Sequence, residues 1–245
     1  MTNDTESLII LDSVDSTNNY AMGLVHSGVS ARPLAVMALV QTAGKGRHTK
    51  QWKSEKGKNL TASFIVDLCP IAIYRQFELT VDVSLACAEL FKKRGATDVQ
   101  IKWPNDIYYN DKKAGGILIE NVLRGNLIKT SVIGIGININ QTNFPEGINA
   151  TSLALITGKE FDVKDICMEL NEMIRKRLEI INTIPFKKRL ADYNSILYGR
   201  GEVRRLKKGN QAFETTILRV DDSGLLVTSD VMERTFQLDE IQWIL

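Results

Sequence analysis

The sequence predicts an α+β protein that ends in a small all-β unit. Over residues 8–197, apolar runs of strand length are mixed with a few longer segments of helical periodicity. From residue 198 onward the apolar runs become short and evenly spaced, with turn residues between them. The chain has 245 residues, which is enough for one large domain and one small one. We therefore expect a larger functional domain at 1–197 and a small β domain at 198–245.

The first elements follow from the apolar spacing and from the residues that stop each run. Short alternating or continuous apolar runs predict strands, the first of them at the edge of a sheet. Longer segments with apolar residues three or four positions apart predict helices, and a glycine ends each of them. The expected strands are 8–12, 34–40 and 59–67, and the expected helices run from Tyr20 to Gly28 and from Tyr74 to Lys93.

The stretch KWPNDIYYNDKKAGGILIE, residues 102–120, predicts a strand end followed by a hairpin. Pro104 lacks a backbone donor and has a fixed φ, so the strand before it must stop or bend. The bend directs Asn105 and Asp106 out of the sheet. The expected strands are 99–103, 107–109 and 114–123, with a turn at 110–112.

This hairpin brings a lysine and two glycines to the same place. Lys113 follows the turn directly, so the returning strand carries it back toward the Asn105-Asp106 pair. Lys112 lies in the turn and, by alternation, points into solvent. Gly115-Gly116 leaves the strand surface without side chains, so that a ligand could lie on backbone. An ordinary surface hairpin with solvated charges is the alternative.

Residues 128–140, IKTSVIGIGININ, predict a strand with two unlike faces. Isoleucines alternate with Gly134, Gly136, Asn138 and Asn140. The isoleucine face suits a core, and the bare face leaves room for something flat and polar; tight backbone packing or a β-bulge explains the bare face equally well. The later helices are expected at 152–157, 163–178 and 185–197, and the later strands at 203–206, 213–220, 225–228 and 235–238.

The composition is that of an ordinary globular protein and excludes several classes. Apolar residues make up 44% and charged residues 24% of the chain, and the net charge of +2 gives no general attraction to nucleic acids or membranes. No apolar run approaches the ~20 residues of a membrane span, and the polar start MTNDTESL is not a signal sequence. Cys69, Cys87 and Cys167 lack metal-ligand spacing and are expected to be buried thiols in a reducing cytoplasm.

Two polar segments could hold a ligand. Ser16, Thr17 and Asn18 lie at the expected N-terminus of the first helix, where small polar side chains can cradle a polar head group; capping of that helix is an equally good explanation. The loop QTAGKGRHTKQW at 41–52 follows a buried strand and is both glycine-containing, hence mobile, and cationic, so it could clamp an anion. It has neither Walker A spacing nor a GxGxxG pattern, and a solvated loop is the alternative.

Taken together, these motifs resemble the signature of biotin–protein ligases. The matching parts are Ser-Thr-Asn at 16–18, the glycine-rich basic loop, KWPND at 102–106 with the lysine and glycine pair that follow, and Gly-Ile-Asn at 136–138. The resemblance covers nearly the whole chain in the right order. It implies a mixed central β-sheet with helices on one side and a small terminal β-barrel of Src-homology-3 type. About 14 residues precede Asp15, so we expect the short form that lacks an N-terminal DNA-binding domain.

The resemblance implies a two-step, ATP-dependent reaction. Biotin and ATP give biotinyl-5'-AMP and pyrophosphate, and a lysine of a biotin carboxyl carrier protein or carboxylase subunit then takes the biotinyl group. The first step joins two anions, a carboxylate and the α-phosphate, so cations must reduce their repulsion. The implied cofactors are ATP and Mg²⁺, with biotin as substrate and the metal ligands unidentified. A cytoplasmic monomer or weak homodimer is expected, without membrane association or specific DNA binding.

The resemblance also implies a role for each motif residue. Lys113, Arg47 and Asp106 are the expected catalytic residues, with Asp106 either assisting deprotonation of the acceptor lysine or serving a structural or magnesium-orienting role. The expected biotin-binding residues are Ser16, Thr17, Asn18, Gln41, Gly44, Lys45, Gly46, Arg47, Lys113, Gly115 and Gly116. The expected ATP-binding residues are Arg47, Trp52, Lys102, Asn105, Asp106, Lys113 and Asn138.

The basic loop departs from the family pattern. Lys45 replaces the first arginine, and His48-Thr49 replaces an arginine–glycine pair. Lysine keeps the charge but lacks the planar fork that binds phosphate through two parallel hydrogen bonds. We therefore expect Arg47 to be the main phosphate ligand of the loop and Lys45 a weaker one.

Two other functions remain open. A lipoate- or octanoate-handling ligase or transferase could use the same scaffold, although the spacing from KWPND to the glycine pair disfavours it. A non-enzymatic regulator that binds nucleic acid could use the loop at 45–50 and the basic strand at Arg204-Arg205, although the small net charge disfavours that function.

Overall fold

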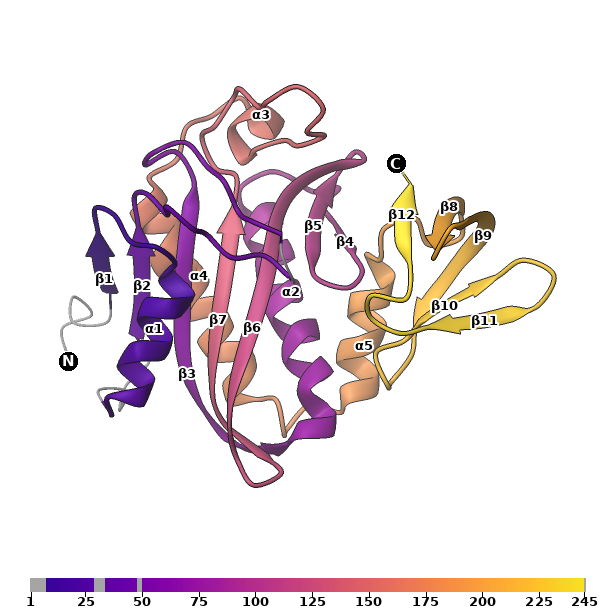
Figure 1. The fold of residues 1–245 in the computed structure, drawn as a ribbon, viewed down its shortest axis with the longest axis horizontal. Coiled ribbons are helices and arrows are strands. Elements are labelled where there is room, and N and C mark those ends of the chain that lie inside the picture. The colour runs from indigo at the N-terminus through magenta and orange to yellow at the C-terminus, as the bar shows by residue number, and fades with distance from the viewer. Residues whose placement is uncertain (1–7, 29–33, 48–49, 245) are drawn as a thin grey trace.

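Two sheets form the framework of the protein (Figure 1). The computed structural model describes residues 8–28, 34–47 and 50–244, apart from the side chains of 68–70. The large sheet has the order β1-β2-β3-β7-β6-β5-β4 and is mixed, because β1 pairs with β2 in parallel and the other neighbours are antiparallel. Its strands are β1 (Leu8–Leu11), β2 (Leu34–Ala38), β3 (Leu60–Ala72), β4 (Gln100–Lys102), β5 (Asp106–Tyr109), β6 (Lys112–Arg124) and β7 (Leu127–Ile137). The predicted mixed central sheet is confirmed.

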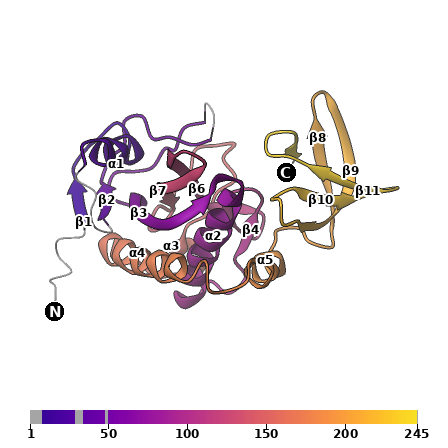
Figure 2. The ribbon, with the colours of Figure 1, turned by 90° about the horizontal axis from the view of Figure 1, so that it is seen from below.

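Helices cover this sheet from both sides. The helices are α1 (Thr17–His26), α2 (Gln76–Lys93), α3 (Leu153–Thr157), α4 (Val163–Glu179) and α5 (Phe186–Ser195), with a 3₁₀ turn at Ile73–Arg75. α2, α4 and α5 share one face, and α1 lies on the other (Figure 2). Alternation along β2 explains this, since Ala35 and Met37 belong to the main core while Val36 packs with Ala21 of α1. The prediction of helices on one side therefore describes α2, α4 and α5, and α1 adds cover to the opposite face.

The C-terminal sheet is antiparallel and has the order β11-β10-β9-β8-β12. Its strands are β8 (Val203–Lys208), β9 (Gln211–Val220), β10 (Leu226–Ser229), β11 (Glu233–Phe236) and β12 (Gln242–Ile244). The first four overlap the predicted strands, although β11 begins two residues before the strand predicted at 235–238, and β12 was not predicted. In the described part of the chain β11 and β12 do not pair with each other, so closure into the predicted barrel is not seen.

The segment between α5 and β8 runs along the edge of the large sheet. Ile101 of β4 donates its N–H to the carbonyl of Ile196 at 2.8 Å and accepts the N–H of Tyr198 at 2.9 Å. The indole N–H of Trp103 donates to the carbonyl of Gly224 at 3.0 Å. These bonds hold the C-terminal sheet beside β4, as Figure 1 shows.

Two predictions about side chains and membranes can also be compared with the structure. Within the described ranges, no helix combines the length and the apolar character needed to cross a bilayer. Cys87 and Cys167 are buried as predicted, and burial raises the pKa of each thiol to about 12. The side chain of Cys69 lies outside the described residues.

Candidate active site

A cavity of about 390 Å³ lies between the large sheet and the C-terminal sheet. It extends from the N-terminus of α1, across β6 and β7, to the turn before β12. Most of the predicted site residues line it, namely Ser16, Thr17, Asn18, Gln41, Lys45, Gly46, Arg47, Trp52, Lys102, Asn105, Asp106, Lys113 and Gly116. The fold thus brings motifs from distant parts of the sequence around one space.

Lys113 and Asp106 form an ion pair in this cavity. The Nζ of Lys113 on β6 lies 2.6 Å from Oδ1 of Asp106 at the start of β5. The two side chains are 35% and 25% exposed, so the ammonium can still face a ligand. The backbone of Lys113 is fixed as well, because its N–H donates to Asn149 at 3.0 Å and its carbonyl accepts from Thr151 at 2.9 Å. The prediction that the hairpin returns Lys113 to Asp106 is confirmed.

The two glycines after Lys113 serve different purposes. A Cβ at Gly116 would lie 3.2 Å from Oδ1 of Asp106 and 3.4 Å from Nζ of Lys113, so a bare residue leaves room for the ion pair. A Cβ at Gly115 would lie 2.9 Å from the carbonyl oxygen of Gly136 on the neighbouring strand. Gly115 therefore permits close strand packing and does not line the cavity. Of the two glycines predicted to form a bare ligand surface, only Gly116 lines the cavity.

In the basic loop at 41–52, residues 44–46 pair with residues 50–52 in an antiparallel manner. Trp52 donates its N–H to the carbonyl of Gly44 at 2.9 Å, and Gly46 donates to the carbonyl of Lys50 at 2.8 Å. A Cβ at Gly44 would lie 2.5 Å from the carbonyl oxygen of Trp52. The glycines thus allow close approach of two backbones, where the sequence suggested mobility. His48-Thr49, part of the predicted basic loop, lies outside the described residues.

Carboxylates from both sheets hold the loop. The Nζ of Lys45 lies 3.5 Å from Oε1 of Glu120 on β6. The Nη2 of Arg47 lies 2.8 Å and 2.9 Å from the two carboxylate oxygens of Asp239. Asp239 lies in the turn between β11 and β12, so the large sheet holds Lys45 and the C-terminal sheet holds Arg47, two residues further along the same arm of the loop.

A buried hydrogen-bond network fixes the opposite end of the cavity. Oε1 of Gln41 accepts the N–H of Thr17 at 2.8 Å and therefore caps α1. The Oγ of Ser63 lies 2.5 Å from Oδ1 of Asn18 and 2.8 Å from Oγ1 of Thr17. The amide of Asn18 donates to Oε2 of Glu120 at 2.7 Å, which links this network to the partner of the basic loop.

Ser16 keeps its hydroxyl available for a ligand. It occupies the N-cap position of α1 but makes no capping bond with its side chain, since Gln41 supplies the cap. It is 1% exposed and lines the cavity. The sequence left open whether Ser16–Asn18 caps the helix or holds a ligand. In the structure Gln41, which lies outside this segment, caps the helix, and Ser16 faces the cavity.

Side chains of the protein itself fill the bare face of β7. A Cβ at Gly134 would overlap the amide of Asn18, and a Cβ at Gly136 would overlap the indole of Trp52. The predicted space for a flat group is thus occupied by Trp52. Its indole N–H is buried and has no hydrogen-bond partner among the described residues, so it can donate to a ligand.

Lys102 is a buried cation among aromatic rings. Its Nζ lies 4.5 Å from the ring centre of Tyr108, 5.3 Å from that of Trp243 and 5.9 Å from that of Tyr198. It also donates to the hydroxyl of Tyr108 at 3.1 Å. Burial lowers the pKa of Lys102 to about 8, and the nearby carboxylate of Asp106 opposes that shift. Rings and a phenol thus replace water around an ammonium that lines the cavity.

The two predicted asparagine ligands differ in position. Asn105 lines the cavity and donates to the carbonyl of Ile117 at 2.6 Å. Asn138 is 5% exposed and does not line the cavity. Its amide donates to the carbonyl of Thr151 at 3.0 Å and to that of Lys113 at 3.4 Å. This arrangement supports a role for Asn138 in holding the backbone of Lys113.

Among the residues around the cavity that sequence reasoning missed are Ser63, Glu120, Asp239 and Trp243. Ser63 lies on the polar face of the strand predicted at 59–67, and Glu120 ends the KWPND hairpin motif, so the position of each carried a signal. Asp239 and Trp243 line the cavity from the C-terminal sheet, and no motif marks either of them. Only the arrangement of the two sheets places them in the site.

Comparison with known proteins agrees with this geometry. Residues 10–138 match the model of a known protein family. The chain belongs to the biotin/lipoate A/B protein ligase family. It is 31% identical over 241 residues to the bifunctional ligase/repressor BirA of Bacillus subtilis, covering 96% of this chain and 73% of that protein.

Solved structures of the ligase family show the same fold. The biotin protein ligase from Aquifex aeolicus in complex with biotin and ATP has a TM-score of 0.79 at 28% identity, over 97% of this chain and 98% of that one. The biotin protein ligase from Leishmania major in complex with biotin has a TM-score of 0.63 at 26% identity, over 95% and 99%. The prediction of a biotin–protein ligase is confirmed by these relatives.

Metal-binding side chains are sparse in this ligase. The described residues contain no group of three or more His, Cys, Asp or Glu that could hold a metal ion. The cavity offers the carboxylates of Asp106 and Asp239, and each contacts a cationic side chain. The donor set therefore suits an ion that arrives with its own phosphate ligands.

Proposed function

We propose that this ligase forms biotinyl-5'-AMP in the cavity between its sheets and then transfers the biotinyl group to a lysine of a biotin carboxyl carrier protein or carboxylase subunit. The observation that carries the proposal is the convergence of cations on one cavity. Lys113, Arg47 and Lys102 reach it from β6, the basic loop and β4. Joining a carboxylate to a phosphate requires such a concentration of positive charge.

The first step forms a mixed anhydride. A carboxylate oxygen of biotin attacks the α-phosphorus of ATP, the bond from that phosphorus to the bridging oxygen breaks, and pyrophosphate leaves. The carboxylate is ionised near neutral pH, so this step needs no base. The ammonium of Lys113, held by Asp106, reduces the repulsion most strongly as charge accumulates at phosphorus. Arg47 is the proposed main phosphate ligand because its planar guanidinium matches a phosphate edge.

We assign the head group of biotin to the end of the cavity formed by Ser16, Thr17 and Asn18. All three are buried, and Gln41 and Ser63 fix two of them by hydrogen bonds. The arm that carries the carboxylate would then extend along the cavity toward Lys113, past the bare Gly116 and beneath the loop at 44–47. Gly44 and Gly115 act on this site through backbone packing.

We assign the nucleotide to the side of the cavity lined by Trp52, Lys102 and Asn105. The buried indole N–H of Trp52 lacks a partner among the described residues. The ammonium of Lys102 has already lost most of its water, so it can meet a phosphate with little further desolvation. Asn138 supports this site indirectly through the backbone of Lys113.

We propose Mg²⁺ as the counter-ion of ATP. In nucleotide sites Mg²⁺ keeps several waters and takes phosphate oxygens with one or two carboxylates, and it rarely needs a cage made by the protein alone. Asp106 and Asp239 already contact cations, so phosphate oxygens and water would hold most of the ion. When bound, Mg²⁺ supplies further neutralisation of phosphate charge.

The second step requires a neutral acceptor amine. This amine attacks the acyl carbon of biotinyl-5'-AMP, and AMP leaves as the bond to its phosphate oxygen breaks. The free pKa of lysine, about 10.4, makes the neutral form rare. The sequence suggested Asp106 as the group that assists deprotonation, but its ion pair with Lys113 favours a different role. We propose that Asp106 mainly orients Lys113.

Pyrophosphate release tests the proposed substrate. The protein is mixed with ATP and Mg²⁺ and either biotin or lipoate, and pyrophosphate is followed in a single turnover. We expect release with biotin and little with lipoate. Comparable release with lipoate would favour the lipoate-handling alternative. Transfer to an isolated carrier domain is measured separately, so that the two steps are not confused.

We also propose a catalytic domain at 1–197, a C-terminal domain at 198–245, a cytoplasmic location and a monomeric or weakly dimeric state. The supporting observations are the separate C-terminal sheet and the two buried thiols, which suit a reducing compartment. Sedimentation at several protein concentrations measures the oligomeric state. A tight dimer or a larger oligomer would contradict the last proposal.

A further inference from the structure

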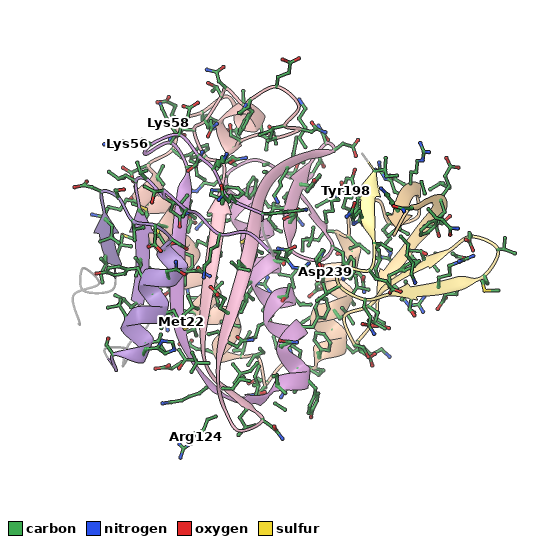
Figure 3. The ribbon with its side chains drawn as sticks, in the orientation of Figure 1. Met22, Lys56, Lys58, Arg124, Tyr198 and Asp239 are labelled. Atoms are coloured by element: carbon green, nitrogen blue, oxygen red, sulfur yellow. The ribbon has the colours of Figure 1, made fainter. Side chains whose placement is uncertain are left out.

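Asp239 is held rigidly at the tip of a tight turn. Its φ is +70°, a left-handed conformation that is uncommon for residues other than glycine. The turn is closed by the N–H of Gln237, which donates to Oε2 of Glu240 at 2.9 Å. Glu240 also pairs with Lys208 of β8, which ties the turn to the body of the C-terminal sheet. Figure 3 shows Asp239 where that sheet faces the large one.

The carboxylate of Asp239 engages one corner of the Arg47 guanidinium. Both of its oxygens contact Nη2, at 2.8 Å and 2.9 Å. Among the described residues, Nε and Nη1 of Arg47 make no hydrogen bond, so the donors on the rest of the fork remain for a ligand. The side chain of Arg47 is 24% exposed, so those donors are accessible.

An acidic residue at an anion-binding cavity needs an explanation. Alone, the Asp239 carboxylate would repel a phosphate. Beside Arg47 its charge is largely neutralised, and it fixes the orientation of a long, flexible side chain. Lys45 is held in a comparable way by Glu120, so these two cations of the loop are anchored on different sheets.

We propose that Asp239 is a positioning residue that holds Arg47 with its free edge toward the phosphate of the adenylate. The inference rests on the proposed role of Arg47 as a phosphate ligand. The C-terminal sheet then helps to retain biotinyl-5'-AMP through the carboxylate of Asp239. This residue lies 192 positions along the sequence from Arg47. Prior orientation of an arginine removes part of the entropic cost of binding.

Release of biotinyl-5'-AMP tests this inference. The enzyme is loaded with labelled biotin and ATP, and loss of the labelled adenylate is followed after dilution. Asp239→Ala should release the adenylate about tenfold faster, whereas Asp239→Asn, which keeps an uncharged acceptor, should release it about threefold faster. The matched control is Glu233→Gln, which breaks the exposed pair with Arg219 in the same sheet at 2.8 Å and should leave release unchanged.

A double variant separates positioning from general damage. If Asp239 acts through Arg47, the variant Arg47→Ala/Asp239→Ala should release the adenylate no faster than Arg47→Ala alone. If the double variant instead releases the adenylate faster than Arg47→Ala, by the product of the two single effects, the inference is overturned. Slower release from Asp239→Ala would also overturn it, because it would show that the carboxylate competes with phosphate. A normal rate in Asp239→Ala together with fast release in Arg47→Ala would reject the inference and leave the proposed role of Arg47 intact. A normal rate in Arg47→Ala would reject both.

Discussion

Two sites in the molecule pair a cationic side chain with carboxylates but differ in how far the cation is buried. One is an ion cluster between α2 and α5, and the other is the ion pair in the cavity. In the cluster, Arg189 of α5 contacts Asp82 and Glu78 of α2, and its side chain is 4% exposed. In the cavity, Lys113 contacts Asp106, and its side chain is 35% exposed. Each region places a cation beside carboxylates, yet only one of them can admit a ligand.

The difference lies in how many donors each cation has already used. Nε, Nη1 and Nη2 of Arg189 all donate, to Asp82, Glu78 and the carbonyls of Ile181 and Ile184. The Nζ of Lys113 makes one hydrogen bond among the described residues, out of the three that an ammonium can donate. Arg189 has thus used four of the five donors of a guanidinium within the fold, whereas two of the three donors of Lys113 remain for a ligand.

Replacing Arg189 with methionine should have the largest effect, because it leaves Asp82 buried without its main partner. We expect the free energy of unfolding to fall by about 3–5 kcal/mol. Urea unfolding near pH 8 measures this loss. The control is Arg175→Met, which removes exposed contacts with Glu172 and Glu179 and should cost less than about 1 kcal/mol. Similar losses in the two variants would show that burial does not distinguish them.

The pH dependence of that loss sharpens the comparison. Burial raises the pKa of Asp82 to about 6, above its unfolded value of about 3.9, although Arg189 opposes the shift. Such a group contributes stability below the unfolded pKa and loses it as the pH rises through the folded pKa. The deficit of Arg189→Met should therefore be greatest near pH 8 and shrink as the pH falls through 6. A deficit that stays constant with pH would point to lost packing.

Lys113→Ala should give the next largest effect, on catalysis and not on folding. We expect the rate of biotinyl-5'-AMP formation to fall by on the order of 10²–10³, as for removal of one preorganised donor. Lys112→Ala is the control, since Lys112 is exposed and lies outside the cavity. Single-turnover adenylation, measured without acceptor protein, gives both rates. A wild-type rate for Lys113→Ala would mean that the hairpin is only a scaffold.

The two loop cations should differ by a smaller amount. Arg47→Ala should release biotinyl-5'-AMP roughly tenfold faster than wild type, and Lys45→Ala only about two- to threefold faster, because lysine lacks the planar fork. Lys45 is also more exposed, at 41% against 24%. Dilution of the loaded enzyme measures both rates, and equal rates would contradict this ranking.

Specific DNA binding should be absent. The basic strand at Arg204-Arg205 is short, and Arg204 already contacts Asp111 at 3.2 Å and Glu202 at 2.5 Å. These two carboxylates already balance much of the Arg204 charge, so less of it is available to a phosphate backbone. A titration with duplex DNA at physiological salt should show no sequence preference. Nanomolar, selective binding would revive the regulator that the sequence left open.

The sequence was sufficient for most of the elements and for the geometry of the KWPND hairpin. Pro104 and the turn at 110–112 predict where the strands end, and pairing of Tyr109 with Lys112 follows. From that register the contact of Lys113 with Asp106 is a local consequence over seven residues. Alternation likewise separated the isoleucine face of β7 from its glycine face.

The rest depends on contacts between distant segments. Gly134 and Gly136 indicated an empty face, but nothing local shows that Asn18 and Trp52 occupy it. The strand β12 has three residues after a turn, too few for a periodic signal. Its turn supplies the partner of Arg47, so that part of the site could not be predicted without the packing of the two sheets.

Residues 196–198 pair with the outer edge of β4, and this pairing affects how a shortened chain would behave. An uncovered edge strand presents backbone donors and acceptors that can pair with another molecule. A chain cut after Ser195 would expose the N–H and carbonyl of Ile101 in this way, and it would remove the carbonyl that accepts from Trp103. The connection therefore protects the folded protein from self-association through sheet extension, and a truncated ligase should aggregate even where its catalytic residues are intact.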